Sequence, residues 1–113
     1  MATTMHNLFA ALPLTGTGEE VVTLFENRAV KIERIVSHGC QSPEGFWYDQ
    51  AQDEWVIVLR GQATLEFAGG ELVHMNPGDH VAIPKHRKHR VARTDGQTIW
   101  LAVHCAGADE ASG

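Results

Sequence analysis

The stretch E-W-V-I-V-L-R-G, residues 54–61, decides the fold that this sequence predicts. Its apolar, β-branched centre lies between two acids, Asp53 and Glu54, and a glycine, Gly61, which is typical of a buried strand. A carboxylate at the start of such a strand is unusual, because burying it without a partner is costly. Glu54 is therefore expected to be solvated at the rim of the fold, paired with a base, or bound to a metal.

Short strand-like segments separated by turn signals continue on both sides of this stretch. Asn76-Pro77-Gly78-Asp79 and Thr94-Asp95-Gly96 are two of the predicted turns, and residues 7–12 could form one or two helical turns before Pro13. After Pro13 no segment has a helical period, so the pattern predicts an all-β, antiparallel sandwich or small barrel. Strands are expected over residues 21–25, 29–37, 46–49, 54–60, 62–67, 71–75, 80–83, 89–93 and 97–104.

The length of 113 residues predicts one domain, and 43% hydrophobic residues are enough to build a core. We expect a barrel over residues 19–105, preceded by a lead-in segment (1–18) and followed by a flexible tail (106–113). Strands that are apolar on both faces, at 55–59 and 99–103, need a second sheet or a second subunit against one face. The sequence therefore predicts a homodimer.

Charge and composition exclude several classes of partner. The net charge is −5 and the only basic cluster, Lys85–Arg90, is interleaved with histidines, so we expect no nucleic-acid partner. No stretch has the length of a membrane span, and the first residues lack the pattern of a secretory signal. Cys40 and Cys105 form neither a metal-type spacing nor a disulfide framework. We expect a cytoplasmic protein with free cysteines.

Two motifs resemble those of the cupin superfamily, and the resemblance covers residues 29–104. The first cupin motif, G-x5-H-x-H-x3or4-E-x6-G, is matched in its second half by Glu54 and Gly61. The second, G-x5-P-x-G-x2-H-x3-N, is matched by Gly78, Pro84 and His89. The resemblance implies an antiparallel double-stranded β-helix, the jelly-roll cupin barrel, with Glu54 and His89 facing each other across its interior.

The sequence also departs from these motifs. The two histidines of the first motif are missing: the looser spacing puts Trp47 and Asp49 in their places, and the tighter spacing puts Tyr48 and Gln50 there. In the second motif, His86 replaces the glycine and Arg93 replaces the asparagine.

A metal site is still possible despite these departures. Asp49, Glu54 and His89 would supply two carboxylates and one imidazole, and His104, on one strand face with Trp100 and Ala102, could add a fourth ligand. Such sets bind a divalent Fe, Mn, Ni or Zn ion. Without a metal, Glu54 and His89 could form an acid–base pair. Trp47 and Tyr48 are expected to line the pocket mouth.

Three functions follow from these alternatives. The resemblance implies a metal-binding cupin that oxidises or isomerises a small molecule or acts on it as a lyase. A metal-free cupin that binds a small ligand for sensing or storage is the second possibility. The third is a metal-free epimerase with His89 and Tyr48 as its acid and base. The sequence does not decide whether there is catalytic turnover.

Overall fold

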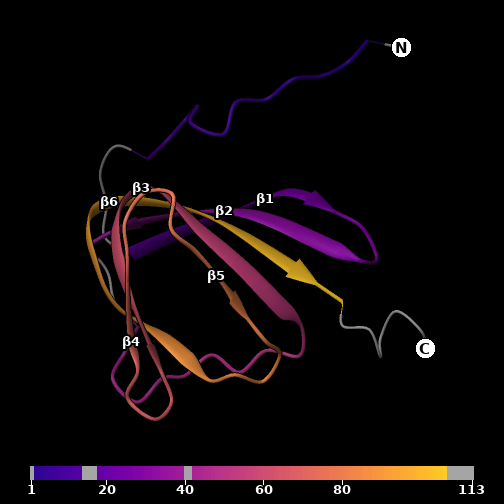
Figure 1. The fold of residues 1–113 in the computed structure, drawn as a ribbon. Coiled ribbons are helices and arrows are strands. Elements are labelled where there is room, and N and C mark those ends of the chain that lie inside the picture. Colours follow the sequence, from indigo (N-terminus) through magenta and orange to yellow (C-terminus); the bar gives the residue numbers. More distant parts are fainter. Residues whose placement is uncertain (1, 14–17, 40–41, 107–113) are drawn as a thin grey trace.

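The computed structural model describes residues 2–13, 18–39 and 42–106, and this part of the chain folds into antiparallel strands without a helix (Figure 1). In these residues there is accordingly no helix able to cross a membrane. The strands are β1 (Gly18–Glu26), β2 (Val30–His38), β3 (Asp53–Phe67), β4 (Leu72–Met75), β5 (His80–Ile83) and β6 (His89–Cys105).

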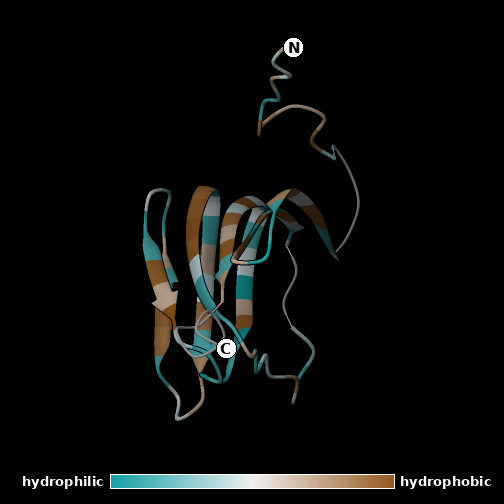
Figure 2. Ribbon diagram, turned by 90° about the vertical axis from the view of Figure 1, so that its right-hand side faces the viewer, coloured by the Kyte–Doolittle hydropathy of each residue, from teal (hydrophilic) through white to brown (hydrophobic). Residues whose placement is uncertain are grey.

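One sheet, in the order β1-β2-β6-β3-β4, folds over on itself to make two layers. Its long central pair, β3 and β6, runs antiparallel from Asp53↔Cys105 to Phe67↔His89. The first half of β3 also pairs with β5 and its second half with β4, so each layer has its own edge strand. Figures 1 and 2 show the central strands curving over at one end of the molecule. The predicted all-β jelly-roll fold is confirmed.

The fold-over of the sheet is located at Gly61. The register of β3 against β6 shifts on both sides of this residue, between Val58 and Gln62. Gly61 has a φ of +83°, and a Cβ atom there would lie 2.5 Å from Oγ1 of Thr98 and 2.6 Å from the carbonyl oxygen of Gln97. A side chain cannot occupy that space, so glycine allows β6 to pass directly against the bend.

This bend explains the main error in the predicted strands. Residues 54–60 and 62–67, expected as two strands, are the two halves of β3, and residues 89–93 and 97–104 are the two halves of β6. The sequence Thr94-Asp95-Gly96 bends β6 instead of reversing the chain. Residues 46–49 form only an isolated bridge, Tyr48↔His89, and residues 7–12 form a turn with an Ala10 N–H to Asn7 carbonyl bond of 3.1 Å.

Apolar side chains from both layers meet in the interior. The second half of β3 contributes Ala63, Leu65 and Phe67, which are buried as their alternation predicts. From the facing layer come Val56, Val58, Trp100 and Ala102. These side chains belong to one hydrophobic core cluster.

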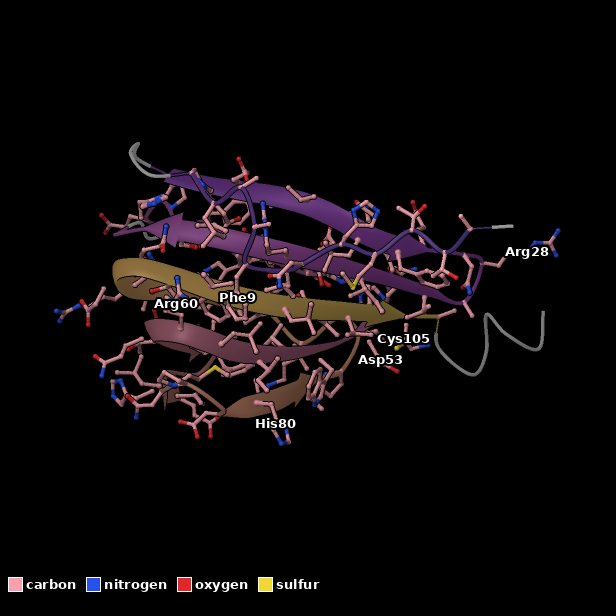
Figure 3. The ribbon with its side chains drawn as sticks, turned by 90° about the horizontal axis from the view of Figure 1, so that it is seen from above. Phe9, Arg28, Asp53, Arg60, His80 and Cys105 are labelled. Atoms are coloured by element: carbon pink, nitrogen blue, oxygen red, sulfur yellow. The ribbon has the colours of Figure 1, made fainter. Side chains whose placement is uncertain are left out.

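The N-terminal segment lies over the outer face of β2 and β6 (Figure 3). Nη1 of the buried Arg34 donates 3.0 Å hydrogen bonds to the carbonyl oxygens of Leu8 and Ala10. Further along, Nε2 of Gln97 donates to the Pro13 carbonyl (3.1 Å), and the guanidinium of Arg60 lies 5.1 Å from the centre of the Phe9 ring. The segment is thus anchored to the sheet.

Some of the predicted segments lie outside the residues that the structure describes. Cys40, residues 14–17 of the lead-in and residues 107–113 of the tail are outside the described residues. Cys105 is a free thiol. β1 exposes Val22, Leu24 and Phe25 at the edge of the sheet, and the homodimer stays a prediction.

We predict that Gly61→Ala lowers the free energy of unfolding by about 3 kcal/mol or more, because it adds both backbone strain and a clash with β6. Gly70→Ala is the matched control: Gly70 also has a positive φ, +100°, but a Cβ there would meet nothing within 4 Å. That change should cost about 1 kcal/mol. Chemical denaturation measures both, and equal losses would show that the contact at Gly61 is unimportant.

Candidate functional site

An open pocket of about 280 Å³ lies between the two layers of the sheet. Its apolar wall includes Ile35, Val56, Leu65 and Trp100. Its polar wall includes the residues Glu33, Tyr48, Gln50, Glu54, His89 and His104, and Glu19 lies at its exposed rim.

The strand register brings the polar groups together from distant parts of the sequence. Glu54, at the start of β3, is directly opposite His104, near the end of β6. His89, at the other end of β6, is bridged to Tyr48 by backbone hydrogen bonds of 2.7 and 3.1 Å. Because β6 is curved, His89 near its start and His104 near its end both line the same pocket.

The Glu54 carboxylate lies between two imidazoles. Its Oε1 is 3.5 Å from Nε2 of His89, and its Oε2 is 3.8 Å from Nε2 of His104. The side chains of Glu54 and His89 are only 9% and 7% exposed, so the pair is shielded from water. In such a setting the charge on each group depends strongly on the other.

His89 is held in one orientation. Its Nδ1 lies 2.8 Å from the carbonyl oxygen of Arg87, so Nδ1 carries a proton and Nε2 faces Glu54. The Tyr48 ring stacks on the imidazole, with 5.5 Å between ring centres. Burial by itself lowers the pKa of His89, but the contact with Glu54 and the Arg87 carbonyl outweigh it, and the pKa is raised above its ordinary value.

A second acid–base contact lies beside the first. Nε2 of His104 is 2.8 Å from Oε1 of Glu33, and Oε2 of Glu33 is 3.5 Å from Nζ of Lys31. The contacts therefore form a continuous chain from Lys31 at the surface, through Glu33, His104 and Glu54, to His89. Glu33 was not among the residues singled out from the sequence; its place beside Ile35 on one face of a strand was the only signal.

The structure divides the residues predicted for the site. Glu54, His89, His104 and Tyr48 line the pocket. Asp49 lies outside it: this exposed carboxylate is 2.8 Å from Nδ1 of the exposed His86. Trp47 is half-buried and is not part of the pocket wall.

Of the two spacings considered for the missing histidines, the tighter one matches the geometry. It assigns their places to Tyr48 and Gln50, and both line the pocket, whereas Trp47 and Asp49 of the looser spacing do not. Side chains alternate along an extended chain, so only one of these two pairs can point inward. A phenol and an amide therefore stand where the family motif has imidazoles.

The four residues predicted as metal ligands do not come together. Asp49 is turned away, and Nε2 of His104 is already engaged by Glu33. Among residues 2–13, 18–39 and 42–106, no group of three or more His, Cys, Asp or Glu side chains is arranged to hold a metal ion. The predicted metal site of Asp49, Glu54, His89 and His104 is therefore not formed as a group of four ligands.

Comparison with known proteins agrees with the fold. The family model described as Cupin domain matches residues 32–104, and the chain belongs to the cupin family. A structure from Ralstonia eutropha JMP134, named as a candidate mannose-6-phosphate isomerase, is 47% identical, with a TM-score of 0.88 over 93% of this chain and 100% of that one.

More distant structures share the fold alone. A cupin superfamily protein from Desulfitobacterium hafniense is 16% identical, with a TM-score of 0.75 over 95% of both chains. An RmlC-like cupin from Desulfovibrio desulfuricans is also 16% identical, with a TM-score of 0.72 over 91% of this chain and 97% of that one. No curated protein matches the chain.

The raised pKa of His89 predicts how stability depends on pH. In the unfolded chain the imidazole titrates near its ordinary value of 6.5, and in the folded protein it titrates higher. The stabilisation is therefore fully present below the unfolded pKa and is lost as the pH rises through the folded pKa. As the pH rises above the ordinary imidazole value of 6.5, the free energy of unfolding should fall more steeply in the wild type than in His89→Gln.

Denaturation at a series of pH values measures this slope, and NMR titration of the His89 ring measures the pKa directly. The control is His86→Gln, because His86 is exposed outside the pocket. It should keep the wild-type slope. A His89→Gln slope equal to that of the wild type would contradict the assignment.

Proposed function

We propose that this cupin binds a small polar carbonyl compound in the pocket and isomerises it by proton transfer through Glu54 and His89. The observation that supports this most directly is the Glu54 carboxylate, buried between the imidazoles of His89 and His104. General acid–base catalysis needs a base and an acid within reach of one bound molecule, and this pair supplies both.

The reaction balances without a co-reactant. The Glu54 carboxylate takes the proton from the carbon next to the carbonyl group, and the C–H electron pair forms the new C=C bond. Protonated His89, the form that the contact with Glu54 and the Arg87 carbonyl favours by raising its pKa, gives its Nε2 proton to the carbonyl oxygen, which yields the enol. Glu54 then returns its proton to the former carbonyl carbon, while His89 takes a proton from the hydroxyl or ammonium group on the first carbon, which gives the isomer and restores both side chains.

The remaining pocket residues have supporting roles in this proposal. The Arg87 carbonyl keeps Nδ1 of His89 protonated, which directs the exchangeable Nε2 proton into the pocket. The apolar wall of Val56, Leu65 and Trp100 limits water around the enol. The name of the 47% identical structure, a candidate isomerase, agrees with the class of reaction.

A metal-dependent function is the second candidate. It is favoured by one observation: His89, which lines the pocket beside Glu54, holds its Nδ1 against a backbone carbonyl, a contact typical of a metal ligand. Metal analysis of the purified protein separates the two candidates. A stoichiometric Fe, Mn, Ni or Zn ion that Glu54→Gln removes would support the second.

The first candidate predicts hydrogen exchange. In D₂O, and with chelator present, the wild type should incorporate deuterium next to the carbonyl group of small hydroxyketones such as hydroxyacetone, as measured by proton NMR. Glu54→Gln and His89→Gln should each slow this exchange by about 100-fold or more, because each removes one proton-transferring group.

The matched controls are Asp49→Asn and His86→Gln, which change the same types of side chain outside the pocket. Both should exchange at the wild-type rate. Loss of exchange in the controls, or its dependence on an added metal ion, would contradict the proposal. Ligand binding without exchange in any compound would favour the sensing or storage function.

A further inference from the structure

The charge of the pocket wall is one-sided. Among the described residues that line the pocket, three are glutamates (Glu19, Glu33 and Glu54) and none is a lysine or an arginine. The possible positive charges are His89 and His104, which already contact Glu54 and Glu33. Lys31 reaches Glu33 from outside the wall and neutralises that carboxylate alone.

The mutual repulsion of these carboxylates affects the pKa of Glu19 at the rim of the pocket. Partial burial raises the pKa of Glu19, and the negative charges of Glu33 and Glu54 raise it further, in spite of the 3.5 Å hydrogen bond that Ser37 donates to Glu19. An entering positive charge would relieve this repulsion. An entering phosphate would increase it, and the wall offers none of the guanidinium or ammonium donors that bind phosphate.

An unpaired acceptor points to the same kind of ligand. Oε1 of Gln50, on the pocket wall, is buried and has no hydrogen-bond partner among the described residues. The Gln50 backbone is fixed, because its carbonyl accepts a 2.7 Å hydrogen bond from the His86 N–H. A buried acceptor without a partner is costly, so a ligand that brings an N–H donor would be favoured.

An unpaired donor completes the pattern. Trp100 is only 4% exposed and lines the pocket, and its Nε1–H has no acceptor in the described part of the chain. A ligand with both a carbonyl oxygen and an N–H group offers the type of partner that each of the two atoms lacks.

We propose that the pocket binds a small organic cation, an ammonium group on the carbon next to a carbonyl, and rejects phosphate esters of the same size. This substrate class rests on the proposed function, since it supplies the carbonyl on which Glu54 and His89 act. It differs from the sugar phosphate in the name of the 47% identical structure. The volume of about 280 Å³ is at the small end for ligand pockets, which suits a compound of a few carbon atoms.

Three probes that differ in one group test the proposal on the full-length protein. They are aminoacetone (cationic), hydroxyacetone (neutral) and hydroxyacetone phosphate (anionic), titrated by calorimetry at neutral pH with chelator present. Aminoacetone should bind about tenfold more tightly than hydroxyacetone, because its ammonium group makes charge-assisted contacts, and the phosphate should not bind. Binding of the phosphate as tightly as aminoacetone would overturn the proposal.

Variants assign the effect to the pocket wall. Glu19→Gln and Gln50→Met should each weaken aminoacetone more than hydroxyacetone, because each removes an acceptor for the ammonium group. Glu44→Gln removes the same charge from an exposed position outside the pocket and should bind both probes as the wild type does. Equal binding by all variants would also overturn the proposal.

Deuterium exchange separates this inference from the proposed function. Exchange of hydroxyacetone without binding of aminoacetone would refute the cationic substrate and leave the proton-transfer site standing. Binding of aminoacetone without exchange would support the cation pocket and refute the proton transfer. A separate titration adds zinc chloride without chelator. If aminoacetone binds without zinc and zinc competes with it, the cation pocket is supported. If aminoacetone binds only when zinc is present, the proposal fails.

Discussion

The close approach of β6 to Gly61 is the contact on which the rest of this structure depends. Thr98, which is fully buried, donates through Oγ1 to the carbonyl oxygens of Gln62 and Asp95, both at 3.1 Å, so it joins the two bent strands at the point where a Cβ atom on Gly61 would stand. Because β3 and β6 bend together here, one continuous sheet supplies both walls of the pocket. The site therefore depends on a backbone contact far from any of its chemical groups.

The bend also determines which side chains line the pocket. β6 is long enough that His89 and His104, near its two ends, both face the interior, and Glu54 is opposite His104 in the register of the sheet. One carboxylate thus contacts two imidazoles in a space lined largely by apolar side chains. In such a space each charge depends on its neighbours, which is why the contact with Glu54 can raise the pKa of His89 although burial opposes it.

The sequence predicted the fold from local signals but could not predict the shape of the long strands. Alternation of Ala63, Leu65 and Phe67 correctly indicated the buried face. Gly61 and Asp95-Gly96 indicated that the strands are interrupted there. The same residue types occur both where a chain reverses and where a strand bends, and only the pairing with the partner strand decides between the two. Glu54 and His89 were found through spacing, whereas Glu33 joins the site through the register of β2 with β6, which no local pattern encodes.

The departures from the cupin motif can be explained together. Tyr48 and Gln50 point into the pocket where the motif has two imidazoles, and neither a phenol nor an amide is a strong ligand for the metals that histidine binds. The same two positions make other contributions: Tyr48 stacks on His89, and Gln50 holds a buried oxygen that has no hydrogen-bond partner among the described residues. Asp49 lies between them in the sequence, so the alternation of the chain turns it outward to His86. The pocket therefore keeps Glu54 and His89 of the motif, while its other two motif positions hold an aromatic ring and an amide.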